Sequence, residues 1–86
     1  MSFKKFIDFC TEGNLLEAKK LNITPTDKVI SDALKNASYN GHLEVVKYLM
    51  EFNYNYTGIG QALINARAKK HFDIVKFLEK MKGFIS

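Results

Sequence analysis

Apolar residues recur every three or four positions along most of the chain, the spacing that places them on one side of an α-helix. In residues 43–52, for example, apolar positions form one face and charged positions form the other. The apolar face holds Leu43, Val46, Leu49 and Met50, and the charged face holds Glu44, Lys47 and Glu51. The pattern predicts helices over residues 3–11, 14–21, 27–40, 43–52, 61–69 and 72–82, the last with Phe72, Val75, Leu78 and Met81 inward.

Residues that interrupt helices separate these segments. Pro25 cannot continue a helix, and Gly41 permits the left-handed turn that ends the segment 27–40. Lys70 stands at the equivalent place before the last helix, where a left-handed conformation costs about 1 kcal/mol relative to glycine. Asn53 is predicted to be a left-handed stop as well. Residues 53–60 are then expected to form the connecting loop.

The stretch from Asn40 to Leu49 recurs 29 residues later in the chain. Residues 32–52 and 61–81, aligned at that offset, share identical residues that are mostly apolar or small. These are Ala33/Ala62, Leu34/Leu63, Asn36/Asn65, Ala37/Ala66, His42/His71, Val46/Val75, Lys47/Lys76 and Leu49/Leu78. A fixed period of this length is typical of stacked helical repeats.

A weaker copy lies at the start of the chain, at an offset of 28 residues. Phe6, Gly13 and Leu21 then match the leucine, glycine and leucine of the second copy. A divergent first copy is expected, because a terminal repeat meets water on one side. The sequence therefore predicts an all-α protein of stacked helix–turn–helix units, forming a single domain over residues 1–86. The units are expected at about 1–25, 26–55 and 56–86.

The second copy reads Ala-Leu-x-x-Ala-x-x-x-Gly-His-Leu-Glu-Val-Val from Ala33 to Val46. This segment resembles the ankyrin repeat, which has Leu-x-x-Ala on its first helix and Gly-His before Leu-Glu-Ile/Val-Val on its second. The resemblance covers most of residues 3–81. The chain departs from the family in two ways: Asp32-Ala33-Leu34-Lys35 replaces Thr-Pro-Leu-His, and the period is shorter than the usual 33 or so residues. Short repeats of this kind are similar to those of large DNA viruses and some protists.

The resemblance implies an ankyrin-like solenoid with shortened loops that binds another protein through its concave face. A viral or regulatory inhibitor of a host protein would fit this design. The two residues before each Gly-His position would face the partner, namely Thr11 and Glu12, Tyr39 and Asn40, and Ala68 and Lys69. Loop residues would join them: Lys28, Val29, Ser31, Tyr56, Thr57 and Ile59. Tyr39 is the best anchor, because tyrosine supplies a large contact area with a polar tip, although it could instead shield a helix end.

The net charge of +4 and the pI of about 9.2 leave two alternatives open. The first is an electrostatic nucleic-acid-binding or competing protein, since Arg67, Lys69 and Lys70 cluster at one turn. Against it, every basic residue except Arg67 is lysine, and no nucleic-acid motif is present. The second alternative is a self-associating structural subunit, because the tail of residues 83–86 carries two apolar residues. We expect a monomer or a weak homodimer.

No residues in the sequence form a catalytic constellation, and we expect neither an enzyme nor a cofactor. His42 and His71 lie one repeat apart, about 10 Å in a helical stack, which is too far for a shared metal ion. Cys10 is the single cysteine and is predicted to be a buried thiol. Neither a secretory signal nor an apolar run of membrane length is visible. The expected location is intracellular and cytoplasmic, or the host cytoplasm if the protein is viral.

Overall fold

The computed structural model describes residues 3–53 and 55–83, which form α-helices and no β-strand. The helices are α1 (Phe3–Glu12), α2 (Leu15–Lys20), α3 (Asp27–Tyr39), α4 (Leu43–Met50), α5 (Ile59–Ala68) and α6 (Phe72–Gly83). The predicted all-α class is therefore confirmed. The largest differences from the predicted bounds are that α4 ends two residues earlier and α5 begins two residues earlier.

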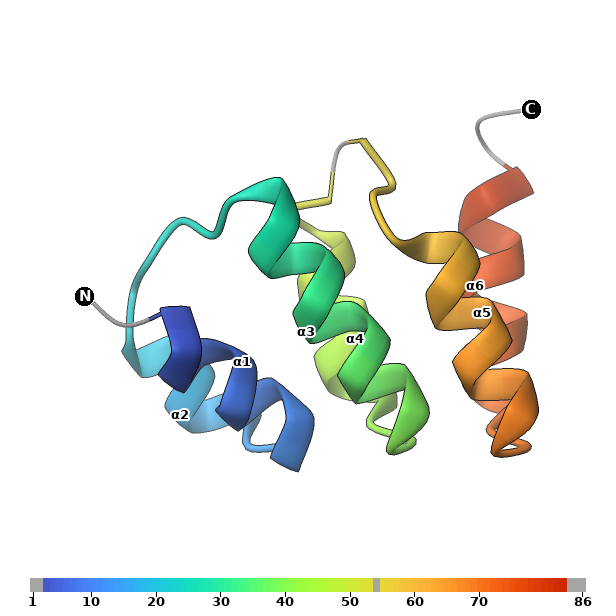
Figure 1. Cartoon of the computed structure of the whole chain (residues 1–86), viewed down its shortest axis with the longest axis horizontal. Helices are drawn as coiled ribbons and strands as arrows, with labels where there is room; N and C mark the ends of the chain where they lie inside the picture. The colour runs from blue at the N-terminus through green and yellow to red at the C-terminus, as the bar shows by residue number, and fades with distance from the viewer. Residues whose placement is uncertain (1–2, 54, 84–86) are drawn as a thin grey trace.

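Consecutive helices pair into hairpins, α1–α2, α3–α4 and α5–α6, which lie side by side in a row (Figure 1). The middle helix α3 contacts α1 on one side and α5 on the other, and α4 also contacts α6. In the view of Figure 1, the turns within the hairpins line the lower edge of the molecule, and the loops between hairpins line the upper edge. The two edges therefore present different sets of residues to solvent.

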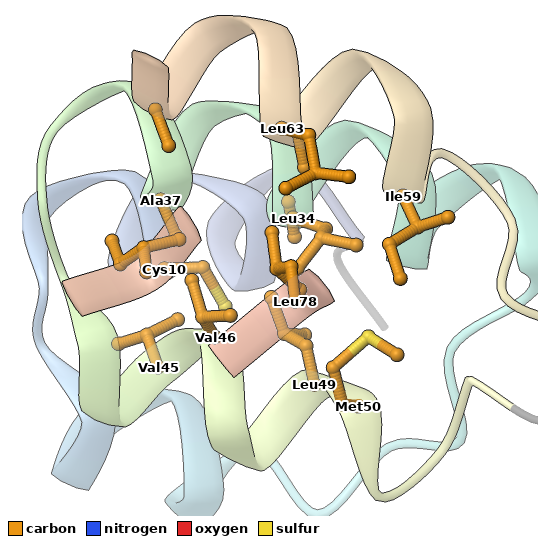
Figure 2. Close-up of a cluster of buried hydrophobic side chains, with 14 of the residues drawn as sticks. Cys10, Leu34, Ala37, Val45, Val46, Leu49, Met50, Ile59, Leu63 and Leu78 are labelled. Carbon is orange, nitrogen blue, oxygen red and sulfur yellow. The ribbon is translucent and has the colours of Figure 1, made fainter. Parts of the chain in front are cut away.

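Small residues let the first helices of neighbouring hairpins approach each other closely. Ala33 and Ala37 on α3, and Ala62 and Ala66 on α5, are all fully buried. Larger apolar side chains from α1, α3, α4, α5 and α6 point toward one another and fill the remaining space (Figure 2). They include Cys10, Leu34, Val45, Val46, Leu49, Met50, Ile59, Leu63 and Leu78. Most of the positions that recur in the sequence are therefore core positions.

Each hairpin turn ends its first helix in the same way. Gly13, Gly41 and Lys70 have positive φ angles of 80°, 80° and 62°. The backbone N–H of the next residue donates to a carbonyl five residues earlier, at 2.8, 3.0 and 2.8 Å for the turns in chain order. This left-handed cap satisfies carbonyl groups that the end of a helix leaves without a partner. The predicted left-handed conformation of Gly41 is confirmed, and Lys70 adopts the same conformation despite its cost.

A histidine of one hairpin packs against the turn glycine of the hairpin before it. A Cβ atom placed on Gly13 would lie 2.5 Å from Nδ1 of His42, and one placed on Gly41 would lie 2.6 Å from Cε1 of His71. Nε2 of His71 also lies 3.1 Å from the carbonyl oxygen of Tyr39. The histidines therefore link neighbouring hairpins, and only a residue without a side chain leaves room for the ring.

Three local predictions are wrong. Phe72 is not inward but 58% exposed, because the register of α6 buries Ile74 in its place, together with Val75 and Leu78, which were predicted inward. Asn53 has no left-handed backbone, and the loop turns at Tyr56 and Gly58, with φ angles of 53° and 78°. Gly60, which was expected in the loop, lies inside α5.

Candidate functional site

Six of the residues expected to face a partner lie beside the hairpin turns. We call this set the turn surface: Thr11, Glu12, Tyr39, Asn40, Ala68 and Lys69. Contacts across hairpin boundaries join its members. The side-chain Nδ2 of Asn40 donates to the carbonyl oxygen of Thr11 at 2.9 Å. Nζ of Lys69 lies 5.1 Å from the centre of the Tyr39 ring. The turn surface therefore runs continuously from α1 to α5, along the lower edge in Figure 1.

Tyr39 is the large apolar group of this surface. Its side chain is 47% exposed, and the backbone carbonyl of the same residue contacts the ring of His71. The ammonium group of Lys69 lies over the ring, an arrangement worth about 0.5–1 kcal/mol at an exposed site. These contacts help to hold Tyr39 in place while leaving part of the ring accessible. Thr11 contributes less, because its hydroxyl donates to the carbonyl oxygen of Ile7 at 2.7 Å within α1.

The loop residues that were expected to join this surface do not lie beside it. Tyr56, Thr57 and Ile59 precede or begin α5, whereas Ala68 and Lys69 follow its other end. A helix of this length separates the two groups by about 15 Å.

Several of these loop residues also serve the core. Ile59 is the first residue of α5 and only 8% exposed, so its expected place in the loop is wrong. Tyr56 packs against the core, and the backbone of Thr57 is bonded to the Asn53 side chain. Val29 is likewise 8% exposed.

The thiol of Cys10 is fully buried, as predicted. Burial raises its pKa from the ordinary value of 9.0 to about 12. A raised folded-state pKa means that the native protein holds this proton more tightly than the unfolded chain does. The corresponding stabilisation is present below pH 9 and is lost as the pH rises from 9 toward 12.

We therefore expect no reaction of native Cys10 with a thiol reagent at pH 8, and complete reaction in denaturant. Between pH 9 and 11 the free energy of unfolding should fall more steeply in the wild type than in Cys10→Ala, by up to about 1.4 kcal/mol per pH unit. Denaturant titrations at several pH values measure both slopes. Rapid labelling of the native protein, or equal slopes, would contradict the buried thiol.

One hollow was missed by the sequence reasoning. It has a volume of about 340 Å³ and lies between α5 and α6, lined by Leu63, Arg67, Glu79, Lys82 and Gly83. Arg67 and Glu79 form an ion pair at its rim. One feature of the sequence pointed to this part of the surface. At the repeat offset, an apolar residue, Ile64 on α5, replaces the charged Lys35 of α3, and Ile64 is exposed.

No arrangement for metal binding was found in the part of the chain that the structure describes, where no three His, Cys, Asp or Glu side chains gather closely enough to hold an ion. The described helices are also all too short or too polar to cross a bilayer. The contacts of the turn surface are hydrogen bonds, one cation–π contact and an exposed ring. This chemistry suits the binding of another macromolecule.

Comparison with known proteins gives one similarity. The chain is 34% identical over 88 residues to the short transient receptor potential channel 3 of Homo sapiens. The match covers 94% of this chain but 9% of the channel, so the chain spans about a tenth of that relative's length. No protein-family model matches the chain, and no solved structure matches it significantly.

Proposed function

We propose that this protein is an ankyrin-like repeat solenoid that binds a partner protein through the turn surface. The observation that carries the proposal is the Tyr39 ring, which is half exposed and positioned by contacts from the next hairpin. Aromatic side chains held in place before binding are typical centres of protein interfaces. The flanking groups Asn40 and Lys69 add hydrogen-bonding capacity and positive charge.

Three observations support the repeat assignment. The Leu-x-x-Ala and Gly-His positions of the sequence are the core and turn positions of the hairpins. The turn geometry recurs at Gly13, Gly41 and Lys70, and the histidine–glycine contacts recur between neighbours. The similarity to a small part of a much larger channel is consistent with a module used within different proteins. On this proposal residues 1–86 form one domain, with no catalytic role.

Direct nucleic-acid binding is a second candidate, because positive charge gathers on the α5–α6 hairpin. Lys70, Lys76 and Lys80 are exposed there. Such binding would weaken linearly in a log–log plot against salt concentration, with a slope set by the phosphate contacts. Protein binding centred on Tyr39 has a weaker salt dependence, since much of its contact is apolar.

The test is a nuclease-treated capture from a lysate of the native host, using wild type and Tyr39→Ala/Lys69→Glu. We expect a captured protein whose recovery falls at least about tenfold in the variant. Leu16→Ala/Lys20→Glu is the matched control. It also removes one exposed apolar side chain and reverses one lysine, but on α2, at residues that are not part of the turn surface.

Thermal unfolding of the three proteins checks that each remains folded. Quantitative mass spectrometry measures recovery, and a titration with the purified partner gives the dissociation constants. Equal recovery by wild type and the Tyr39 variant, or equal loss in the α2 control, would remove the turn surface from consideration. Capture that disappears on nuclease treatment would favour nucleic acid instead.

A further inference from the structure

The net positive charge of the chain is confined to its last hairpin. Residues 1–55 contain seven basic and seven acidic residues, whereas residues 56–86 contain six basic and two acidic ones. In the first two hairpins, ion pairs join Lys4 to Asp8, Lys20 to Glu17, Lys28 and Lys35 to Asp32, and Lys47 to Glu44. Within the described part of the last hairpin, the ion pair is that of Arg67 with Glu79. This hairpin is therefore an electropositive end of the molecule.

The same hairpin leaves one side of α5 uncovered. Gly60, Ile64 and Arg67 are exposed and follow one another at helical spacing, and together with Glu79 and Lys82 of α6 we call them the end face. Leu63, which is only 3% exposed, lies beneath them. Ile64 is 58% exposed, and a Cβ atom on Gly60 would meet open space. The hollow of about 340 Å³ opens between Leu63 and Lys82. In Figure 1 this hairpin is the last in the row, and no further helix lies beyond it among the described residues.

The equivalent side of α3 is covered by a helix. At the repeat offset, the α5 residues correspond to Ser31, Leu34, Lys35 and Ser38 on α3. Ser38 is fully buried whereas Arg67 is exposed, and Asn65 of α5 donates to the carbonyl oxygen of Lys35 at 3.2 Å. Leu34 and Leu63 are both buried in the core. The end face thus continues the surface on which, one hairpin earlier, α5 itself packs. A helix is the occupant that this geometry accepts.

A further unit with a histidine at the equivalent position would not pack here as the earlier units do. Gly13 and Gly41 accept His42 and His71 because they have no Cβ, but Lys70 carries one at the equivalent left-handed position. A second copy of this chain fits no better, since its α1 would meet the end face. Lys5 and Phe9 on α1 stand where α3 and α5 have the buried alanines that allow close approach.

We propose that the end face binds an acidic amphipathic helix of a partner protein. Its apolar side chains would cover Ile64 and enter the hollow beside Leu63. Its carboxylates would pair with Lys82 and join the existing ion pair of Arg67 with Glu79, at the border of that apolar centre. Charge complementarity favours an acidic helix, because the hollow is lined by two basic side chains, Arg67 and Lys82, and one acidic side chain, Glu79. Glu79 pairs with Arg67, so the excess positive charge of the lining is that of Lys82. This surface is separate from the turn surface, so the two proposals fail independently.

The probe for the test is a synthetic helix of about 15 residues, cross-linked so that it is helical in solution. It carries leucine and alanine on one face and glutamate along both borders. Two further peptides serve as comparisons: one with lysine in place of glutamate, and one with the same composition in scrambled order. Amide chemical shifts of the full-length protein locate the binding, and fluorescence anisotropy of labelled peptide gives the dissociation constants.

We expect saturable binding of the acidic helix, with shifts concentrated at residues 60–67 and 79–83. Arg67→Glu/Lys82→Glu should weaken it about tenfold or more, because pairs beside a buried centre change from attractive to repulsive. Lys28→Glu/Lys47→Glu is the matched control, with the same change in net charge but on α3 and α4. Ile64→Ser tests the apolar contact without disturbing the fold, since this side chain is exposed, and should weaken binding as well.

Several outcomes would overturn the proposal. They are equal binding of the scrambled or the lysine peptide, equal weakening in both charge-reversal variants, and shifts confined to the turn surface. Equally tight binding of a single-stranded oligonucleotide, lost in the same variants, would assign the end face to nucleic acid. Peptide binding that appears only after deletion of residues 84–86 would make that segment of the chain the occupant.

Discussion

Replacement of Gly41 by alanine is expected to lower the free energy of unfolding by about 2–4 kcal/mol, one of the two largest effects that we predict for a single substitution. The backbone of Gly41 is left-handed, with φ at 80°, which costs an alanine about 1–2 kcal/mol. In addition, the new Cβ would lie 2.6 Å from Cε1 of His71, so the ring must move. That movement would disturb the contact between Nε2 of His71 and the carbonyl of Tyr39.

Urea denaturation of the wild type and the variant measures this difference. Gly60→Ala is the matched control, because Gly60 lies within α5 and a Cβ atom there would meet open space. It should stabilise the protein by about 0.5–1 kcal/mol through helix propensity. If Gly41→Ala costs no more than a few tenths of a kcal/mol, the close packing of His71 on this turn is wrong.

Asn53→Ala is expected to lower the free energy of unfolding by about 2–3 kcal/mol. The Asn53 side chain is 1% exposed and bonds both backbone groups of Thr57. Its Oδ1 accepts from the N–H of Thr57 at 2.8 Å, and its Nδ2 donates to the carbonyl oxygen of Thr57 at 3.0 Å. The substitution removes both bonds and leaves a buried gap where the loop turns toward α5.

Asn55→Ala provides the comparison for this loop. The Asn55 side chain is exposed and donates to Asp27 at 3.0 Å, so its loss should cost less than about 1 kcal/mol. Denaturation midpoints of both variants compare the two losses of stability, and hydrogen exchange at residues 57–62 shows whether the loop is the part that is destabilised. Equal effects of the two substitutions would mean that the buried amide does not hold the loop.

The helices and the turn residues were predictable because each depends on local pattern. Helical spacing of apolar residues identified the helices, and the recurrence of Gly41 at Gly13 and Lys70 located the turns. The alignment placed Lys70 at the position of Gly41, but its left-handed conformation was left open, because lysine is a poor residue for that conformation. The buried alanines were likewise expected, since small residues at matching positions indicate close helix contact.

The errors fall where tertiary contacts override local preference. Asparagine often adopts the left-handed conformation at the end of a helix, which is why Asn53 was expected to do so. Its side-chain amide instead forms hydrogen bonds with the backbone of Thr57. Ile59 directly follows Gly58, and its burial as the first residue of α5 was not visible from spacing alone. Phe72 shows the opposite error, since it was expected inward but is exposed. The buried side chains near it on α6 are those of Ile74 and Val75. The hollow between α5 and α6 is lined by side chains from both helices, so the pattern of a single segment could not predict it.

The row arrangement has a consequence for how tightly the turn surface binds. Tyr39 ends α3, the helix with neighbours on both sides, and its ring and backbone are held from the following hairpin. Because this ring is already held in place, a partner that contacts it restricts few further side-chain motions, and less conformational entropy is lost on association. The end hairpins have a neighbour on one side and open at lower free energy. Opening of the α1–α2 hairpin leaves the Lys69 and His71 contacts of Tyr39 in place, whereas opening of the α5–α6 hairpin removes them. The complex should therefore survive partial opening of the first hairpin but not of the last.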